Sequence, residues 1–327
     1  MVSATDELSV DRAPSPSLRD RVRGLLLRSE ALRGYLLLSP TLLVMFAMLI
    51  VPIGGMVAFS FFTQVYFDID TTPTLNNYWT IIKPGEGATY LGIPFPLETP
   101  IYVILLVKSL LMSFVATTVI ILLAYPMAYF LAFRVTKHKI LWLIIITIPF
   151  WTSYLLRVFA WKVILGYNGV INSGLISLGV ITDPLGFILY NPTSVIITLA
   201  HAWLAFAILP IYVSLEKIDR SLLEAATDLG DNPVERFLRI TLPLSMPGVI
   251  SSSLLVFIPT VGDYITPTLV GGTSGIMVGN IIQSLFGKAN NAPLGAAVSI
   301  AMMLVVTALV CVFLWSVGYN KMKARGA

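Results

Sequence analysis

Long apolar runs without charged residues recur along this chain of 327 residues and limit its fold more than any other feature. A helix needs roughly 20 apolar residues to cross the hydrocarbon core of a bilayer, and the core of a water-soluble domain needs no such runs. Hydrophobic residues make up 57% of the chain and charged residues only 12%, whereas soluble domains have about 25% charged residues. The sequence therefore predicts an all-α integral membrane protein.

Six runs are long enough to form transmembrane helices. They cover residues 35–62, 101–133, 140–165, 192–215, 246–265 and 293–319. Pro149 is expected to kink the third span, because proline removes a helix hydrogen bond. Pro247 is expected to open the fifth span, because proline suits the first turn of a helix. Short helices are predicted between the spans, near residues 170–178 and 277–286.

Basic residues indicate how these spans are oriented. Of the 21 Lys and Arg residues, 16 lie in residues 1–34, 134–139, 216–245 and 320–327. These four segments alternate with segments that have few bases, and loops rich in Lys and Arg face the cytoplasm. We therefore expect a cytoplasmic tail at residues 1–34, one transmembrane domain at 35–319 with a cytoplasmic loop at 216–245, and a cytoplasmic tail at 320–327. This scattered distribution argues against a nucleic-acid-binding surface.

The loop at residues 216–245 contains a polar, amphipathic stretch, SLLEAATDLGDNPVERFLRITLP, which begins at Ser221. Ser221 and Glu224 have the spacing of a capping box, and Gly230 is well placed to end that helix in a left-handed turn. Leu222, Ala225, Ala226 and Leu229 are expected to share one face. Asn232, Pro233 and Glu235 predict the start of a second helix. We call residues 221–243 the cytoplasmic island; the alternative interpretation is an ordinary amphipathic linker.

No catalytic constellation is evident in the chain. A phosphate-binding loop needs a glycine five residues before the glycine of a Gly-Lys pair, but Ile282 has that position before Gly287-Lys288. We therefore expect no ATP hydrolysis, no cofactor and no metal in this chain. Of its two histidines, His201 lies within an apolar span and is interpreted as a packing residue.

Ionisable residues within the spans are candidates for a solute path, because charges in a membrane are costly and usually functional. Arg157 and Asp263 lie at similar depth in the third and fifth spans, so we expect them to pair, either as a structural lock or on the path. Aromatic residues surround the same half of the spans. The candidate path residues are Trp151, Tyr154, Arg157, Asp263 and Tyr264.

The island resembles the EAA loop of ABC importer permeases. That pattern is matched by Glu224, Ala225, Ala226, Gly230, Ile240, Leu242 and Pro243 at the expected spacing. Three further stretches resemble the spermidine/putrescine group of these importers: IPFWTSYLLRVFAW (148–161), GDYITPTLVGG (262–272) and NAPLGAA (291–297). The resemblance covers residues 35–319 and implies a type I ABC importer permease fold in a bacterial inner membrane.

The resemblance also implies the partners of this chain. It implies an ABC ATPase dimer that binds ATP, a second and different permease subunit, and an external solute-binding protein. The helix from Glu224 to Gly230, including Asp228, would be the coupling helix that docks on the ATPase. Polyamine is the expected solute, and another organic cation, an opine-like solute or an iron chelate remains an alternative. A stand-alone secondary transporter or a membrane scaffold is the alternative from another class.

Overall fold

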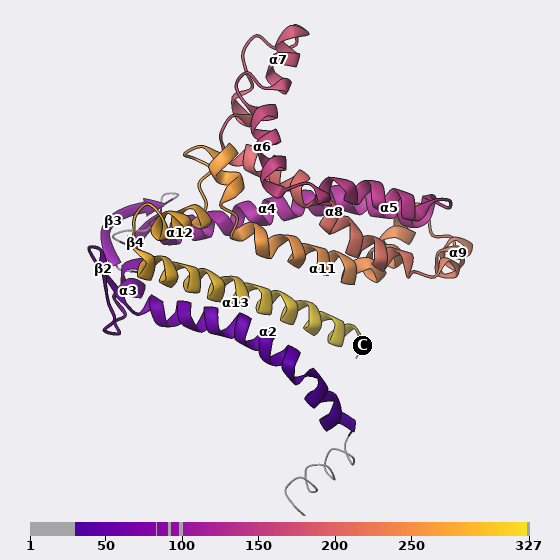
Figure 1. Cartoon of the computed structure of the whole chain (residues 1–327). Helices are drawn as coiled ribbons and strands as arrows, with labels where there is room; N and C mark the ends of the chain where they lie inside the picture. Colours follow the sequence, from indigo (N-terminus) through magenta and orange to yellow (C-terminus); the bar gives the residue numbers. More distant parts are fainter. Residues whose placement is uncertain (1–29, 83, 91–92, 98–100, 326–327) are drawn as a thin grey trace, which may run out of the picture. The chain divides into compact units, whose positions relative to one another are not determined.

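The computed structural model describes residues 30–82, 84–90, 93–97 and 101–325 (Figure 1). The chain divides into two units, residues 1–58 and 59–327, and each is described by itself. All of the first unit's described residues, 30–58, belong to helix α2 (Glu30–Ser60). Within its segment Gly34–Ser60, an 18-residue stretch has a mean hydropathy of 2.5, which confirms the first predicted span as an apolar helix of sufficient length.

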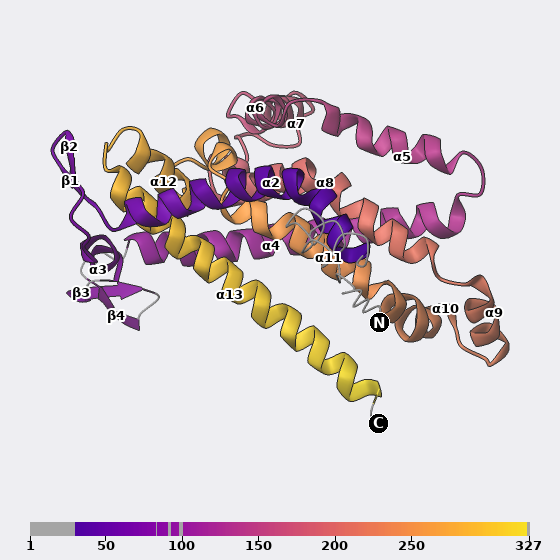
Figure 2. The same ribbon diagram turned by 60° about the horizontal axis from the view of Figure 1, so that its bottom comes forward.

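Three long helices form the centre of the second unit. They are α4 (Ile101–Tyr129), α8 (Pro192–Glu216) and α11 (Leu242–Val261), and α4 continues through the π-helical turn η1 (Phe130–Arg134). Figures 1 and 2 show them side by side, and α8 contacts both of the others. Their shared core contains several buried alanines: Ala124, Ala128, Ala200 and Ala207. Small residues let helix backbones approach closely, which is how helices associate within a bilayer.

The contact between α8 and α11 depends on one glycine. A Cβ atom built at Gly248 would lie 2.5 Å from the Ser214 Cβ and 2.6 Å from the Pro210 carbonyl oxygen. Polar side chains also join the three helices: Ser252 Oγ donates to the Ala207 carbonyl at 2.8 Å, and the hydroxyls of Tyr125 and Ser245 lie 2.8 Å apart. The three helices are therefore locked by close packing and by hydrogen bonds that need no water.

The third predicted span is broken, not merely kinked. It consists of α5 (Lys139–Thr147), the 3-10 turn η2 (Ile148–Trp151), α6 (Tyr154–Leu165) and α7 (Val170–Ser177). The two halves meet at an angle of 83°. Pro149 begins the break, and Thr152 and Ser153 follow it in extended conformations. The Thr152 hydroxyl donates to the Pro149 carbonyl at 2.7 Å, which satisfies a backbone acceptor at the break.

The fifth span begins much earlier than predicted. Helix α10 (Pro233–Arg236), the π turn η4 (Phe237–Thr241) and α11 form one continuous helical segment of 29 residues, Pro233–Val261. The prediction that Pro247 opens this span is wrong, since Pro247 lies inside α11. Prolines are tolerated within membrane helices where neighbouring groups satisfy the freed carbonyls. As a consequence, the second helix of the island is the end of a span.

Several short elements lie at the end of the second unit opposite α9 (Arg220–Asp228) (Figure 1). These are two antiparallel strand pairs, β1 (Thr63–Val65) with β2 (Asp68–Asp70) and β3 (Pro84–Tyr90) with β4 (Ile93–Leu97), together with α3 (Asn76–Ile82) and α12 (Val278–Phe286). The long α13 (Ala292–Arg325) begins at this end and runs back along the unit. The short turns η3 (Gly186–Ile188) and η5 (Pro267–Gly271) complete the unit. Helices α7 and α12 confirm the two predicted short helices. The strand pairs were not predicted.

Five helices of the described residues are long and apolar enough to cross a membrane, and the bent pair makes a sixth span if its halves are counted together. The predicted second, fourth and sixth spans match the α4–η1 segment, α8 and α13 within a few residues, although α13 extends to Arg325. The structure therefore agrees with six spans and adds the short strands.

Candidate functional site

The N-cap of the island's first helix differs from the predicted one. Helix α9 begins at Arg220, and Asp219, not Ser221, is its N-cap. The Asp219 Oδ1 atom accepts a hydrogen bond of 3.0 Å from the Ser221 backbone N–H. This bond holds the pKa of the Asp219 carboxyl below its usual value. Stability from this cap is therefore present at neutral pH and is lost as the pH falls through the lowered pKa.

The C-terminal end of α9 has the predicted left-handed glycine. Gly230 has φ +95°. The Gly230 N–H donates to the Thr227 carbonyl, and the Asp231 N–H donates to the Ala226 carbonyl, both at 3.0 Å. This pair of bonds is the Schellman motif, in which a left-handed residue ends the helix and satisfies its last carbonyls. The prediction for Gly230 is confirmed.

The second helix of the island begins as predicted. Asn232 Oδ1 accepts hydrogen bonds from the N–H groups of Val234 and Glu235, each at 3.0 Å. Glu235 Oε2 in turn accepts from the Asn232 N–H at 3.2 Å, which completes a capping box with Pro233 at the first helical position. The direction in which α10 leaves the turn is therefore fixed by side chains of the turn itself.

Two arginines of the helical segment Pro233–Val261 tie α9 and its turn to that segment. Arg236 Nη1 donates to the Thr227 hydroxyl, and Arg239 Nη1 pairs with Asp231 Oδ1, both at 2.8 Å. The Arg239 side chain is 67% exposed and Thr227 is also exposed, so each contact contributes little stability alone. Together with the capping groups they give the island a defined shape, which is what a rigid docking element requires.

The apolar face predicted for α9 does not pack against the protein. Of its four members only Ala226 is buried, whereas the Leu229 side chain is 87% exposed. Val234, across the turn, is 65% exposed. Glu224 and Asp228 are also exposed, and within the described residues their side chains form no hydrogen bond or ion pair. The island thus presents apolar side chains and free carboxylates away from the rest of the second unit.

The remaining residues of the EAA-like pattern belong to the continuous helical segment and not to the exposed turn. Ile240 lies in η4, and Leu242 and Pro243 form the start of α11. Ile240 and Leu242 are half-buried. The two ends of the pattern therefore occupy different environments, one exposed on α9 and one packed where the segment enters the predicted membrane region.

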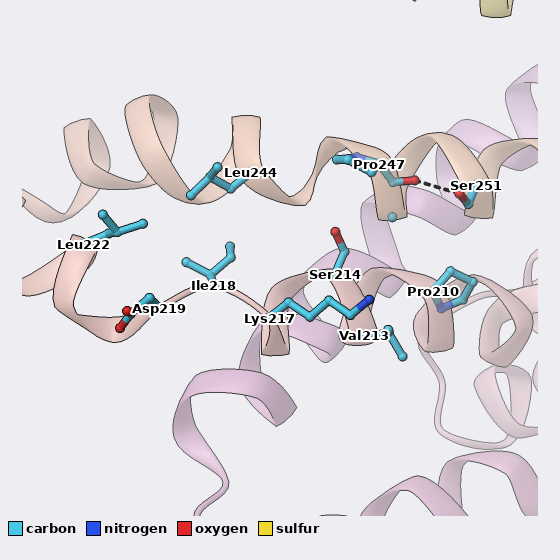
Figure 3. A pocket seen from close by; sticks show the side chains of 11 residues that line it. Pro210, Val213, Ser214, Lys217, Ile218, Asp219, Leu222, Leu244, Pro247 and Ser251 are labelled. Carbon is cyan, nitrogen blue, oxygen red and sulfur yellow. Dashed lines mark hydrogen bonds between the residues drawn. The ribbon is translucent and has the colours of Figure 1, made fainter.

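A groove lies between α8 and α11, beside the start of α9. Its volume is about 590 Å³, and it is lined from three elements. Figure 3 shows Leu222 and Leu244 at one end and the Lys217 side chain extending along the groove toward Pro210. Apart from its chain connection, α9 contacts mainly α10 and η4. The groove therefore lies along the α8–α11 contact, beside the linker that leads into α9.

The candidate solute-path residues do not form the predicted ion pair. Asp263 accepts a hydrogen bond of 2.5 Å from the Tyr154 hydroxyl, and the Thr266 hydroxyl lies 2.7 Å from that same group. Asp263 Oδ1 also accepts from the Ile265 N–H at 2.9 Å. Asp263 therefore caps the helical turn that leads into η5 and joins it to α6.

Arg157 is held by other groups. Its Nη1 donates to the Ala202 carbonyl at 3.1 Å, and the guanidinium carbon lies 4.7 Å from the centre of the Phe150 ring. Within the described residues no carboxylate forms an ion pair with Arg157, so the predicted Arg157–Asp263 pair is wrong. The contact with Phe150 crosses the break in the third span. Arg157 therefore connects α6 to η2 through Phe150 and to α8 through Ala202.

Two other candidates on the path point outward. Trp151 is 88% exposed and Tyr264 is 44% exposed on the isolated chain. The structure therefore groups Tyr154 and Asp263 in one hydrogen-bonded node, with Arg157 beside it, and leaves Trp151 and Tyr264 outside that node.

The node predicts a ranking of variants. Asp263→Ala is expected to destabilise the protein by roughly 2 kcal/mol or more, because loss of a cap costs about 0.5–2 kcal/mol and a hydrogen bond to a charged group contributes about 1.5–3 kcal/mol. Tyr154→Phe should cost less, since the cap remains. Thermal unfolding in detergent measures this ranking.

Transport by Asp263→Asn and Arg157→Lys separates a structural role from a role on the solute path. Normal transport by both variants would exclude these residues from the solute path.

Comparison with known families decides the class of the protein. The family described as "Binding-protein-dependent transport system inner membrane component" matches residues 33–325. The chain belongs to this family. The match includes the island and every predicted span, so the chain is a permease subunit of a type I ABC importer.

Curated relatives of this permease cover most of its length. It is 39% identical over 234 residues to the spermidine/putrescine transport system permease protein PotB of Haemophilus influenzae, covering 70% of this chain and 82% of that protein. It is 37% identical to PotB of Escherichia coli, covering 74% and 90%. The inner membrane ABC transporter permease protein YdcU of Escherichia coli is 31% identical, covering 75% and 77%.

Solved structures agree on the fold of the permease. A chain of a bacterial alginate ABC transporter, crystallised with an alginate pentasaccharide-bound periplasmic protein, superposes with a TM-score of 0.60 at 18% identity, covering 89% of this chain and 95% of that chain. A second alginate importer structure gives 0.59 at 17% identity, covering 89% and 96%. At these identities the likeness shows the fold alone.

Sequence reasoning missed several parts of the permease's island. Asp219 could have been found, because an aspartate just before an amphipathic helix is a common cap. The contacts of Arg236 and Arg239 have no local signal, since they depend on how the turn folds back. The exposure of Leu229 was also missed, because an apolar residue on a helical face is usually assigned to the core.

Proposed function

We propose that this permease carries a polyamine such as spermidine or putrescine from an external binding protein to the cytoplasm, driven by ATP hydrolysis in partner subunits. The observation that supports this solute best is the 37–39% identity to PotB proteins over 70–74% of the chain. The stretches 148–161, 262–272 and 291–297, which resemble the same group, lie in the broken third span, near η5 and at the start of α13.

In this proposal the island faces the cytoplasm, with both chain termini on the same side. The distribution of 16 of 21 Lys and Arg residues over alternate segments supports this orientation. The strand pairs, α3 and α12 then lie on the external side, at the end of the second unit opposite α9. Solute released by a binding protein therefore enters at that end.

The island is the element on which the ATPase docks and through which it moves the permease. Glu224, Ala225, Ala226, Asp228 and Gly230 form or end the helix that docks, and the exposed carboxylates face basic groups of the ATPase. The segment of Ile240, Leu242 and Pro243 transmits the movement, because it continues without interruption to Val261. At 1.5 Å per residue these 29 residues span about 43 Å. A flexible linker would absorb a displacement that this segment passes on.

The proposed assembly has two ATPase subunits, this permease, a second and different permease and a solute-binding protein. ATP is bound by the ATPase subunits and not by this chain, which has no glycine at position 282 for a phosphate-binding loop. Closure of the ATPases on ATP would rock the two islands and change which side of the membrane the solute site faces.

A transport assay in cells tests the solute. The chain is expressed with its neighbouring ATPase, permease and binding-protein genes in a host that lacks polyamine uptake, and import of labelled spermidine and putrescine is measured. We expect uptake that requires all four components and is unaffected by an excess of an opine or an iron chelate. If either of those compounds is imported and polyamines are not, the proposed solute is wrong, although the permease class remains.

A further inference from the structure

The β1–β2 hairpin presents two aromatic side chains at its tip. The strands pair from Thr63 with Asp70 to Val65 with Asp68, which leaves Tyr66 and Phe67 as the two residues of the turn. Tyr66 is 91% exposed and Phe67 is 92% exposed. Figures 1 and 2 show the hairpin projecting at the end of the second unit opposite α9. Packing within this chain therefore does not account for the presence of two aromatic residues at the turn.

The turn is held in a conformation that its sequence does not favour. Tyr66 has φ +53° at the first turn position, where two-residue hairpins usually have glycine when φ is positive. The Gln64 side chain fixes this conformation by donating from Nε2 to the carbonyls of Tyr66 at 3.0 Å and Asp68 at 3.2 Å. Strained residues of this kind concentrate at binding sites, where surrounding contacts pre-organise them.

The base of the hairpin is equally well fixed. Asn77, which is buried in α3, donates from Nδ2 to the carbonyls of Ser60 at 2.8 Å and Phe62 at 2.7 Å. The Thr74 N–H donates to the Phe61 carbonyl at 2.7 Å, and α3 packs against α13 through Ile81 and its neighbours. The two rings therefore stand on a rigid platform and lose little conformational freedom when a partner covers them.

The surface beside the rings is negatively charged. Asp68 and Asp70 are exposed on β2, and residues 61–82 contain no Lys or Arg. A hydrogen bond of 2.9 Å from the Thr72 N–H to Asp70 Oδ1 keeps the pKa of that carboxyl below its usual value, so it stays ionised. Carboxylates next to the rings disfavour insertion into a bilayer, which the rings alone would allow.

We propose that the tip of the β1–β2 hairpin is an anchor for the external solute-binding protein, with Tyr66 and Phe67 filling an apolar recess and Asp68 and Asp70 pairing with basic side chains at its rim. The inference rests on the proposed function, because the binding protein is the partner that approaches this side of the permease. Aromatic residues on rigid supports are the usual centres of binding energy in such interfaces. The acidic rim raises the association rate at low salt.

Binding of the purified binding protein to the full complex in lipid nanodiscs tests this proposal. Phe67→Ser and Tyr66→Asn are measured, since asparagine tolerates positive φ and removes only the ring. Loss of one anchor is expected to raise the dissociation constant about 10- to 30-fold. Asp68→Asn with Asp70→Asn should mainly slow association and flatten its salt dependence. Leu178→Ala, a residue 78% exposed in another loop, is the matched control.

Two results would overturn the anchor. One is an unchanged dissociation constant in Phe67→Ser and Tyr66→Asn while the wild type binds. The other is a result with a dye-labelled variant. Phe67→Cys is made in a Cys311→Ala background and labelled with an environment-sensitive dye, because Cys311 is the only cysteine of this chain. Its emission should shift when the binding protein is added. A full shift on nanodisc insertion alone indicates a membrane anchor, and a shift with the second permease alone indicates a subunit contact. If the wild-type complex binds no solute-binding protein, the proposed function itself fails.

Discussion

Replacing Gly230 with valine is expected to lower ATP-dependent uptake by about 5- to 150-fold. Gly230 has φ +95° and ends α9 through the Schellman bonds. A side chain in that conformation costs roughly 1–3 kcal/mol, and a β-branched one lies at the upper end. A cost of about 1–3 kcal/mol lowers the population of the turn that can dock by about 5- to 150-fold. Uptake and ATPase stimulation in proteoliposomes measure the effect.

The surroundings of Gly230 make this prediction specific. A Cβ atom at this position would have nothing within 4 Å, so valine acts through the backbone alone and not through a clash. Gly230→Asn is the matched control, because asparagine tolerates positive φ, and it should keep most of the uptake. Gly230→Ala should fall between the two. Equal activity of the valine and asparagine variants would contradict a role for the left-handed turn.

Replacing Leu229 with aspartate is expected to separate the permease from its ATPase. This side chain is 87% exposed at the C-terminal end of α9, so it is available to enter a recess on a partner. A charged group in that recess would lose the leucine contact and lack a counter-charge. The dissociation constant for the ATPase should rise about 30-fold or more, as for the loss of a strong anchor. Co-purification and titration with the ATPase measure it.

The control for this variant is another exposed leucine outside the island. Leu178→Asp changes a side chain that is 78% exposed after α7 and should leave the ATPase bound. Both variants should insert and melt like the wild type, because neither residue is packed. If Leu229→Asp retains full ATPase binding while Gly230→Val loses it, the docking surface lies elsewhere on the island.

The spans could be predicted because their signal is local. A run of apolar residues long enough to cross a bilayer specifies a helix without reference to the rest of the chain. The turn at Gly230 and the capping box of Asn232 and Glu235 were predictable for the same reason, since each depends on residues within one helical turn. Asp219 shows the limit of such patterns, because two plausible caps stood two residues apart and only the structure distinguishes them.

Contacts between spans were not predictable in the same way. Arg157 and Asp263 lie at similar depth, but depth does not fix the direction in which a side chain points. The 83° break after Pro149 turns α6 so that Tyr154 reaches Asp263 and Arg157 reaches the Ala202 carbonyl. The fifth span starts earlier than predicted because Pro247 lies inside α11 and does not begin it. Prolines mark boundaries less reliably in membrane helices, where neighbouring groups compensate for the lost hydrogen bond.

The most direct test of the account is transport by purified components in liposomes. The permease pair is reconstituted with the binding protein and labelled polyamine outside, and the ATPase with ATP inside is either included or omitted. We predict accumulation of solute only when the ATPase and hydrolysable ATP are both present, with none from this chain alone or with its partner permease. Accumulation without the ATPase would contradict the central claim that the island is moved by a separate motor.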